Sequence, residues 1–167
     1  LCVGSINTFL INKKLRGYVS INVQSGEAMD THSFATLIGV GATTVNPYLA
    51  FDSLHQRFIK KLFGQFSFDE CVERYIKSVN AGLLKIMSKM GISVLSSYRG
   101  GCNFETVGLS RSIVDDYFPG VTSKISGIGL TGIEKKIREI HKEAFESSET
   151  VLPIGGIYRY RKNGETH

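Results

Sequence analysis

One glycine pattern in this sequence is of the type that can hold a dinucleotide. Gly127, Gly129 and Gly132 match G-x-G-x-x-G and lead into an expected helix. A dinucleotide site also needs a strand directly before the loop and an acidic residue at the end of the following strand. Residues 124–126 are a poor strand by composition, and no strand-end carboxylate follows at the required distance. We therefore interpret these glycines as the residues of a tight loop into a helix.

The histidines are the next candidates for chemistry, as general bases or metal ligands. His32, His55 and His141 all fall within expected helices or at their ends. No G-x-S-x-G elbow supplies a nucleophile for them, and no HExxH, EF-hand or Walker pattern occurs in the sequence. We expect structural histidines, and we assign no catalytic, cofactor-binding or metal-binding residue.

The cysteines form no recognisable site. Cys2, Cys71 and Cys102 are far apart in the sequence, and none belongs to a CxxC or Cys/His spacing. An odd number of such cysteines argues against a zinc site or a disulfide framework. We interpret them as buried or half-buried thiols in a reducing cytosol.

Composition excludes several classes of protein. The 167 residues are 42% hydrophobic and 21% charged, as in one ordinary folded domain. The net charge of +5 is spread over small groups of basic residues, which argues against nucleic-acid binding. The uncharged stretch 32–51 is interrupted by Asn46 and Pro47, so we expect no membrane span. The chain starts at Leu1 without a secretory signal, which we interpret as a cut inside a larger polypeptide.

The candidate residues are carried by alternating strands and helices, which is typical of an α/β architecture. The predicted strands are 18–23, 42–46 and 92–96, and the predicted helices are 31–38, one that begins at Pro47, 68–90, 110–117 and 133–145.

Capping signals support several of these helices. Asp30 and Ser110 can each cap the helix that follows. Ser67 with Glu70, and Thr131 with Glu134, have the spacing of capping boxes. Helix 68–90 also has an apolar stripe at spacings of three and four, and Gly91 is suited to a left-handed C-terminal turn. The stripe consists of Val72, Tyr75, Ile76, Val79, Leu83, Ile86, Met87 and Met90.

The segment 39–51 resembles the late βα unit of flavin-binding (β/α)8 barrels. In those barrels the turn commonly reads Gly-Arg-Pro, and its backbone N–H groups and arginine hold the flavin phosphate. Here the turn reads Val45-Asn46-Pro47-Tyr48, without the arginine and the glycine. We therefore predict an α/β fold with a partial or incomplete (β/α) barrel that resembles an FMN-linked oxidoreductase TIM barrel, without FMN.

An ordered series of segments resembles the large subunit of the glutamate synthase family, from about Leu15 to the end of the chain. The segments are Ser25–Ala28, Thr31–Ala35, Gly39–Ala50, Lys77–Gly100, Phe104–Leu109, Asp116–Gly120, Ile128–Leu130 and Gly155–Arg161. They occur in the order and with the spacing of that family.

This resemblance implies an enzyme built of modules, which makes two glutamates from glutamine and 2-oxoglutarate. A cysteine nucleophile hydrolyses glutamine, and ammonia passes through an internal tunnel to an FMN and [3Fe–4S] domain, with NAD(P)H or ferredoxin as electron donor. The expected partners are the glutaminase and FMN-binding domains of the same polypeptide, with a small subunit or ferredoxin for the parent, but no nucleic acid or membrane. The expected location is cytoplasmic, or plastid in a eukaryote.

By the same resemblance, residues 1–150 are the later part of the cofactor-free central domain, and 151–167 lead toward the FMN-binding domain. We expect a scaffold role between the two active sites. The candidate inter-domain or tunnel contacts lie in loops after strands: Asn46, Pro47, Tyr48, Ser97, Tyr98, Arg99 and Gly100.

Three alternatives remain open from the sequence. In the first, Tyr98 and Arg99 only close a turn. In the second, the chain is a self-sufficient flavin- or nucleotide-binding (β/α) enzyme that uses the barrel-like turn or the Gly127 loop. In the third, it is a binding or assembly module that exposes apolar surface.

Overall fold

The computed structural model describes residues 1–101 and 103–146. The chain divides into two compact units, Leu1–Gly129 and Leu130–His167, and each is considered by itself. Cys102, the connector predicted from residue 147 to 150 and the predicted domain 151–167, with its segment Gly155–Arg161, lie outside the described residues.

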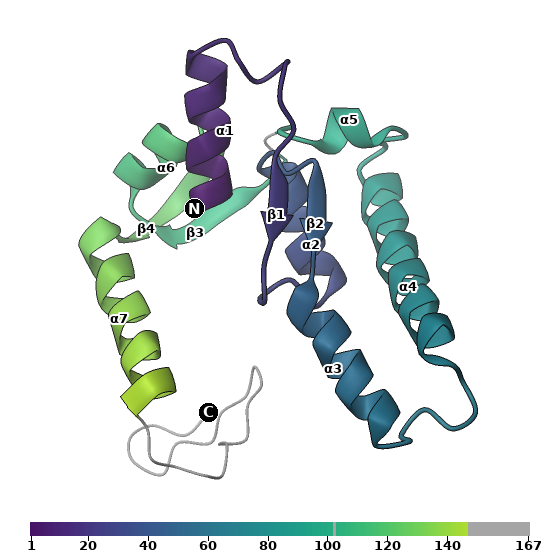
Figure 1. The fold of residues 1–167 in the computed structure, drawn as a ribbon. Helices are drawn as coiled ribbons and strands as arrows, with labels where there is room; N and C mark the ends of the chain where they lie inside the picture. Colours follow the sequence, from purple (N-terminus) through teal and green to yellow (C-terminus); the bar gives the residue numbers. More distant parts are fainter. Residues whose placement is uncertain (102, 147–167) are drawn as a thin grey trace. The chain divides into compact units, whose positions relative to one another are not determined.

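The first unit contains a βαβ arrangement whose two strands are parallel (Figure 1). Strand β1 (Asn22–Gln24) pairs with β2 (Thr44–Asn46), and helix α2 (Thr31–Gly39) connects them. The predicted helix 31–38 is confirmed, and Asp30 caps it by accepting a 2.8 Å hydrogen bond from the Ser33 amide. The strand predicted at 18–23 is shorter and later, because only residues 22–24 have a strand partner in the described chain.

Two helices then form a hairpin. Helix α3 (Tyr48–Ile59) begins after Pro47 as predicted, and α4 (Phe68–Lys89) returns beside it. The predicted capping box is confirmed: Ser67 Oγ accepts from the Glu70 amide, and Glu70 accepts from the Ser67 amide. Gly91 has φ +69°, the left-handed conformation expected after the helix. The turn between α3 and α4 lies at the lower end of both ribbons in Figure 1.

The strand predicted at 92–96 is wrong. Ile92 instead donates its amide to the Met87 carbonyl, which closes the end of α4, and residues Leu95–Tyr98 form the short helix α5. β-branched composition suggested a strand here, but the end of α4 already uses the backbone hydrogen bonds that a strand would require.

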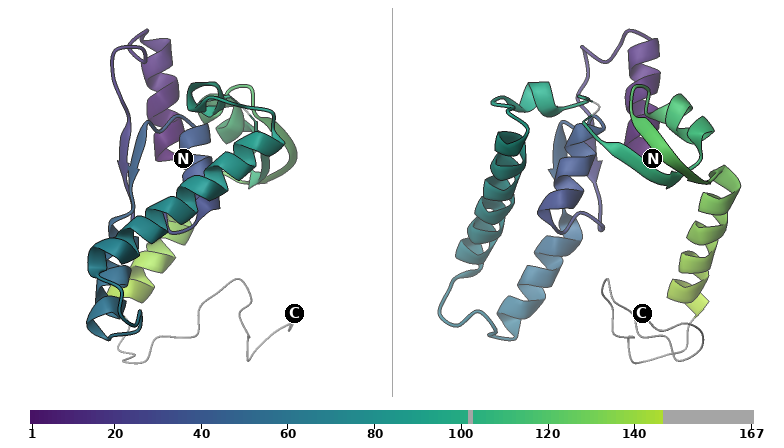
Figure 2. Two further views of the ribbon diagram at one scale, coloured as in Figure 1. Left: turned by 90° about the vertical axis from the view of Figure 1, so that its right-hand side faces the viewer. Right: turned by 180° about the vertical axis from the view of Figure 1, so that it is seen from behind.

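A second parallel βαβ arrangement follows, which the sequence reasoning missed except for its helix (Figure 2). Strand β3 (Glu105–Leu109) pairs with β4 (Thr122–Ile128), with two register shifts, and α6 (Arg111–Tyr117) lies between them in sequence. Ser110 caps α6 as predicted. The interpretation of 124–126 as a poor strand is therefore wrong, because the exposed surface of β4 accommodates its polar residues.

Helix α1 (Cys2–Asn12) packs against α6, where Thr8 Oγ1 donates to the Tyr117 carbonyl at 3.2 Å. Its other anchor is Arg16, which donates 2.7 Å bonds to Asn7 Oδ1 and the Val19 carbonyl, and a 2.8 Å bond to the Gly41 carbonyl. The start of the chain is thereby tied to the turn between α2 and β2.

The described part of the second unit is α7 (Leu130–Glu146). The helix begins one residue before Thr131, so the predicted capping box of Thr131 with Glu134 is wrong. The Glu134 carboxylate instead accepts a 2.8 Å bond from Arg138 Nε, one turn further along the helix.

The core of the first unit lies between α2 and α4. Ala28, Phe34 and Val79 form one buried cluster. Ala35, Ile38, Met87 and Tyr98 form the other. The described chain thus mixes helices with two small parallel strand pairs, and the partial barrel stays a prediction.

Candidate functional site

The predicted contact turn Asn46–Pro47–Tyr48 lies at the carboxyl end of β2. The Asn46 carbonyl accepts the amide of Ser25 at 3.1 Å, so the end of β2 is bonded to the turn after β1. Pro47 is the residue before α3, and no side chain caps that helix. Tyr48 is 43% exposed, and a Cβ at Gly26 would lie 2.9 Å from its hydroxyl oxygen. Tyr48 therefore covers the Gly26 turn while part of its ring faces outward.

An apolar groove of about 480 Å³ lies beside this turn, between β2, α2, α3 and α4. Its position agrees with the general rule that parallel strands present their sites at the carboxyl end. It is lined by Phe34, Ile38, Thr43, Thr44, Val45, Asn46, Pro47, Phe51, Tyr75, Ile76, Val79, Asn80, Leu83 and Leu95. We regard this groove, with the turn at its edge, as the candidate site.

Tyr75 stiffens one wall of the groove. Its hydroxyl donates to the Met29 carbonyl at 3.1 Å, and its ring meets Phe51 edge to face at 5.9 Å between centroids. Burial, and then the negative charge of Asp30, raises the pKa of the Tyr75 phenol. A phenol with a raised pKa stays protonated at neutral pH, so Tyr75 serves here as a hydrogen-bond donor.

The donor set of the groove does not fit a flavin phosphate. None of the lining residues is charged, and Pro47 has no N–H to offer at the start of α3. Phosphate sites at helix N-termini depend on such backbone donors and, in flavin barrels, on an added cation. The residues present suit an apolar occupant, and we derive no reaction step through FMN.

The second predicted contact segment, Ser97 to Gly100, has a different setting from the one expected. Ser97 and Tyr98 form the end of the short helix α5, and Arg99 and Gly100 follow it, so the segment does not come directly after a strand. Tyr98 is only 1% exposed and donates its hydroxyl to the Ala35 carbonyl at 3.2 Å. Its ring meets Phe104 edge to face at 6.0 Å, and burial raises the pKa of its phenol.

The end of this segment is also anchored within the chain. Gly100 adopts φ +71° and donates its amide to the Gly39 carbonyl at 2.9 Å. Arg99 is half-buried, and Ser97 is exposed. The observed contacts of Tyr98 and Gly100 are those of residues that close a turn over α2.

The sequence therefore placed one contact segment beside the groove and one away from it, since none of Ser97–Gly100 lines it. Sequence reasoning found Tyr75, Val79 and Leu83 only as an apolar stripe, and it missed Phe34 and Phe51. The apolar positions of three neighbouring helices were the available signal, but their convergence depends on the tertiary fold.

The glycine motif and the histidines lie outside the groove. Gly127 lies in β4, where an added Cβ would collide with the backbone of Gly108 in β3, so this glycine permits close strand pairing. His55 meets Phe68 at 5.2 Å, and His141 meets Phe145 at 4.5 Å between ring centroids. His32 is exposed in the first turn of α2.

Across 1–101 and 103–146, no group of three His, Cys, Asp or Glu side chains is arranged to hold a metal ion. Among the helices of those ranges, none has the length and apolar character to cross a membrane.

Comparison with known proteins gives a consistent set of relatives. A sequence profile of the glutamate synthase central domain matches residues 1–110. The chain is 53% identical over 167 residues to the large chain of glutamate synthase [NADPH] of Azospirillum brasilense, and 44% identical over 169 residues to that of Bacillus subtilis. It is 41% identical over 177 residues to the ferredoxin-dependent glutamate synthase of Pyropia yezoensis.

These matches cover all of this chain but only part of each relative. The chain spans 11% of the length of the two bacterial relatives and 12% of the length of the algal one.

Proposed function

The chain belongs to the glutamate synthase central-domain family, and we propose that it is a non-catalytic segment that holds the glutaminase and FMN synthase domains of a glutamate synthase in register. The observation that carries this proposal is the 53% identity across all 167 residues to a glutamate synthase large chain, of which they make up 11%.

The proposed parent converts glutamine, 2-oxoglutarate and a reductant into two glutamates. Its glutaminase would release ammonia, and its FMN and [3Fe–4S] domain would use that ammonia. The relatives are described as NADPH-, NADH- or ferredoxin-dependent, so the parent would use one of these donors. The parent would be cytoplasmic, or located in a plastid if eukaryotic.

Two structural observations support a role in positioning. The groove beside Asn46 carries no charged side chain that could assist a reaction. Apolar side chains such as Val107 and Ile125 are more than 60% exposed, although soluble domains usually bury such residues. A segment that is covered by other domains would have both properties. Within this proposal, Asn46, Pro47 and Tyr48 are the candidate inter-domain or tunnel contacts, with Arg99 and Ser97 as secondary ones.

The test uses the full-length parent subunit with Tyr48→Ala, a change that removes an exposed ring without opening the core. We expect glutaminase activity to persist while less of the released ammonia is incorporated into glutamate, because the neighbouring domain loses its contact. The measurement compares free ammonia with glutamate formed per glutamine hydrolysed. Tyr18→Ala is the matched control, since Tyr18 is 84% exposed and lies away from the groove. Unchanged coupling in the Tyr48 variant would contradict a contact at this turn.

A self-sufficient flavin or nucleotide enzyme is the rival function, and it predicts a ligand effect. A bound ligand stabilises a folded chain by RT ln(1 + [L]/Kd). We expect the melting temperature of the purified 167-residue chain to be unaffected by FMN or NAD(P)H. A yellow protein, or a concentration-dependent rise in Tm, would favour the rival.

A further inference from the structure

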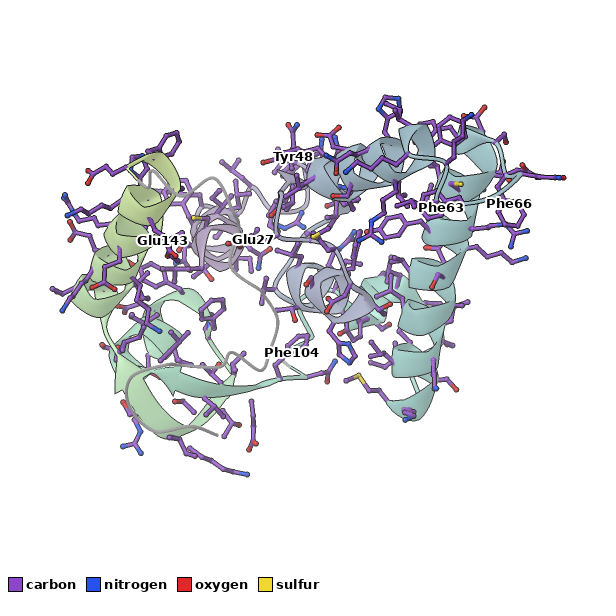
Figure 3. All side chains as sticks on the ribbon, turned by 90° about the horizontal axis from the view of Figure 1, so that it is seen from below. Glu27, Tyr48, Phe63, Phe66, Phe104 and Glu143 are labelled. Atoms are coloured by element: carbon purple, nitrogen blue, oxygen red, sulfur yellow. The ribbon has the colours of Figure 1, made fainter. Side chains whose placement is uncertain are left out.

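The turn that joins α3 to α4 presents apolar side chains to solvent. We call residues 57–66 the hairpin tip. Ile59 is 64% exposed, Leu62 is 65% exposed and Phe66 is 42% exposed. Figure 3 labels Phe63 and Phe66 at the end of the hairpin, where α3 and α4 meet. The patch lies away from the groove, because none of residues 57–66 lines it.

The hairpin tip is held by its own backbone. The Lys61 amide donates to the Phe58 carbonyl at 2.8 Å, and the Leu62 amide donates to the Arg57 carbonyl at 3.1 Å. This is the paired bonding of a Schellman motif. Lys61 has φ +54° in that motif, a left-handed conformation that is unfavourable for a residue with a Cβ. The exposed side chains are thus presented by a defined turn.

Aromatic contacts support the tip from the helix side. Phe68 meets Phe58 at 5.9 Å between ring centroids. Arg74 of α4 lies over the ring of Phe66, with 4.1 Å between its guanidinium carbon and the ring centroid. The first contact joins α3 to α4, and the second holds the end of the turn against α4. An apolar patch fixed in this way can bind a partner with little loss of conformational entropy.

Basic residues are interspersed with the exposed apolar ones along the hairpin tip. Arg57, Lys60 and Lys61 are all exposed. Over residues 1–101 and 103–146, the ion pairs of the structure involve other cations, so these three charges are not neutralised there. The Glu70 carboxylate at the start of α4 accepts hydrogen bonds from Ser67 in the capping box. A surface that covers the tip would therefore be complementary if it carried carboxylates.

We propose that the hairpin tip docks into an apolar depression rimmed by carboxylates on another domain of the same polypeptide. The inference rests on the proposed function, because it takes the covering surface from the parent subunit. The chain makes up 11% of its bacterial relatives, so most of such a polypeptide lies outside residues 1–167. The three cations determine the acidic character of the receiving surface, and Ile59, Leu62 and Phe66 determine its apolar centre.

The test places a photo-reactive side chain at the tip of the full-length parent subunit, as Leu62→p-benzoylphenylalanine. Leu84→p-benzoylphenylalanine is the matched control, because Leu84 is also 65% exposed and lies on α4. After irradiation, mass spectrometry identifies the peptides joined to each position. We expect position 62 to crosslink within the subunit, to an acidic segment outside residues 1–167, with a yield several times that of position 84.

Charge reversal separates a docking contact from simple proximity. Lys60→Glu with Lys61→Glu is expected to lower the crosslink yield at position 62 about fivefold, and added salt is expected to lower it in the unreversed subunit. Lys85→Glu with Lys89→Glu reverses two charges elsewhere on α4 and should leave the yield unchanged.

Several results would overturn the inference: a yield at position 62 no greater than at position 84, a crosslink to a second subunit or separate protein, or a yield insensitive to charge reversal. These failures differ from failure of the proposed function. If the parent reading frame encodes no glutaminase or FMN domain, the proposed function itself is wrong. If those domains are present and the tip does not crosslink to either, only the docking inference is wrong.

Discussion

The two βαβ arrangements of the chain differ in what covers them. In the first, α4 packs on α2, so Phe34 contacts Val79 and Ile38 belongs to one buried cluster with Met87. In the second, α6 buries Ile113 and Val114, but Val107 of β3 and Ile125 of β4 are 64% and 61% exposed.

The same βαβ topology is therefore covered by a second helical layer in one region and leaves apolar strand residues exposed in the other. The first arrangement has a second helical layer from its own chain. The strands of the second have an apolar surface that no described side chain of residues 1–129 covers to the same degree. We infer that the first holds its own stability, whereas the second depends on what covers it in the parent protein.

The largest expected effect is at the centre of the first arrangement. Tyr98→Ala removes a 1% exposed ring and the hydrogen bond to Ala35, so we expect a loss of about 3–5 kcal/mol of unfolding free energy. Tyr98→Phe keeps the ring and should cost about 1 kcal/mol. Urea denaturation of the 167-residue chain measures both. The control Tyr18→Ala changes an 84% exposed ring and should be nearly neutral. A small effect for Tyr98→Ala would contradict a self-supporting first core.

The next effect should be confined to the second arrangement. A side chain at Gly127 would collide with Gly108 of the neighbouring strand, so Gly127→Val should separate β4 from β3 at a cost of about 1–3 kcal/mol. Hydrogen exchange is the measurement: β3 amides should lose protection while α4 amides keep theirs. Gly17→Ala is the control, since nothing lies within 4 Å of an added Cβ there. Equal loss of protection in α4 would show that the two arrangements unfold together.

A smaller effect concerns the start of α4 in the first arrangement. Ser67→Ala removes the capping acceptor of the Glu70 amide and should cost about 1 kcal/mol. Ser88→Ala, in the last turn of the same helix, is the control. Thermal denaturation followed by circular dichroism compares the two variants. If they melt at the same temperature, the cap does not contribute.

Low pH should destabilise the starts of α4 and α2. Hydrogen bonds from Ser67 hold the pKa of Glu70 below its usual range, and hydrogen bonds from Ser33 do the same for Asp30. A carboxyl group whose pKa is lower in the folded than in the unfolded state stabilises the fold. This stability is fully present above the unfolded-state pKa, about 4, and is lost as the pH falls through the folded-state pKa. We expect the urea concentration at the unfolding midpoint to decrease as the pH is lowered below about 4. In Glu70→Gln this decrease should be less steep. An identical pH profile in that variant would contradict the assignment.

The smallest effect tests what holds the second strand pair together. Lys124 and Glu105 form an ion pair across β3 and β4, but both side chains are at least half exposed. Such pairs contribute about 0–1 kcal/mol because water and salt screen them. We therefore expect Glu105→Gln to leave strand protection in hydrogen exchange unchanged, so that Gly127→Val and Glu105→Gln differ clearly.

Local signals predicted the helices well. Asp30, Ser67 and Ser110 each begin a helix as expected, because a cap needs only the residues one turn away. Local signals failed where a partner decides the outcome. Residues 122–128 form a strand despite weak propensity because residues 105–109 pair with them. Residues 95–98 form a helix, and within 1–101 and 103–146 no strand pairs with them.

The sequence by itself determined the starts of α2, α4 and α6, the left-handed turn at Gly91 and the family, since all of these depend on residue order and spacing. Only the tertiary structure decided that Tyr98 is buried and that Phe34, Phe51 and Tyr75 converge beside Asn46. It also decided that the hairpin tip presents Leu62 among cations that form no ion pair with the described side chains. These properties depend on which distant elements meet, and burial and long-range contacts are not encoded in any single window of residues.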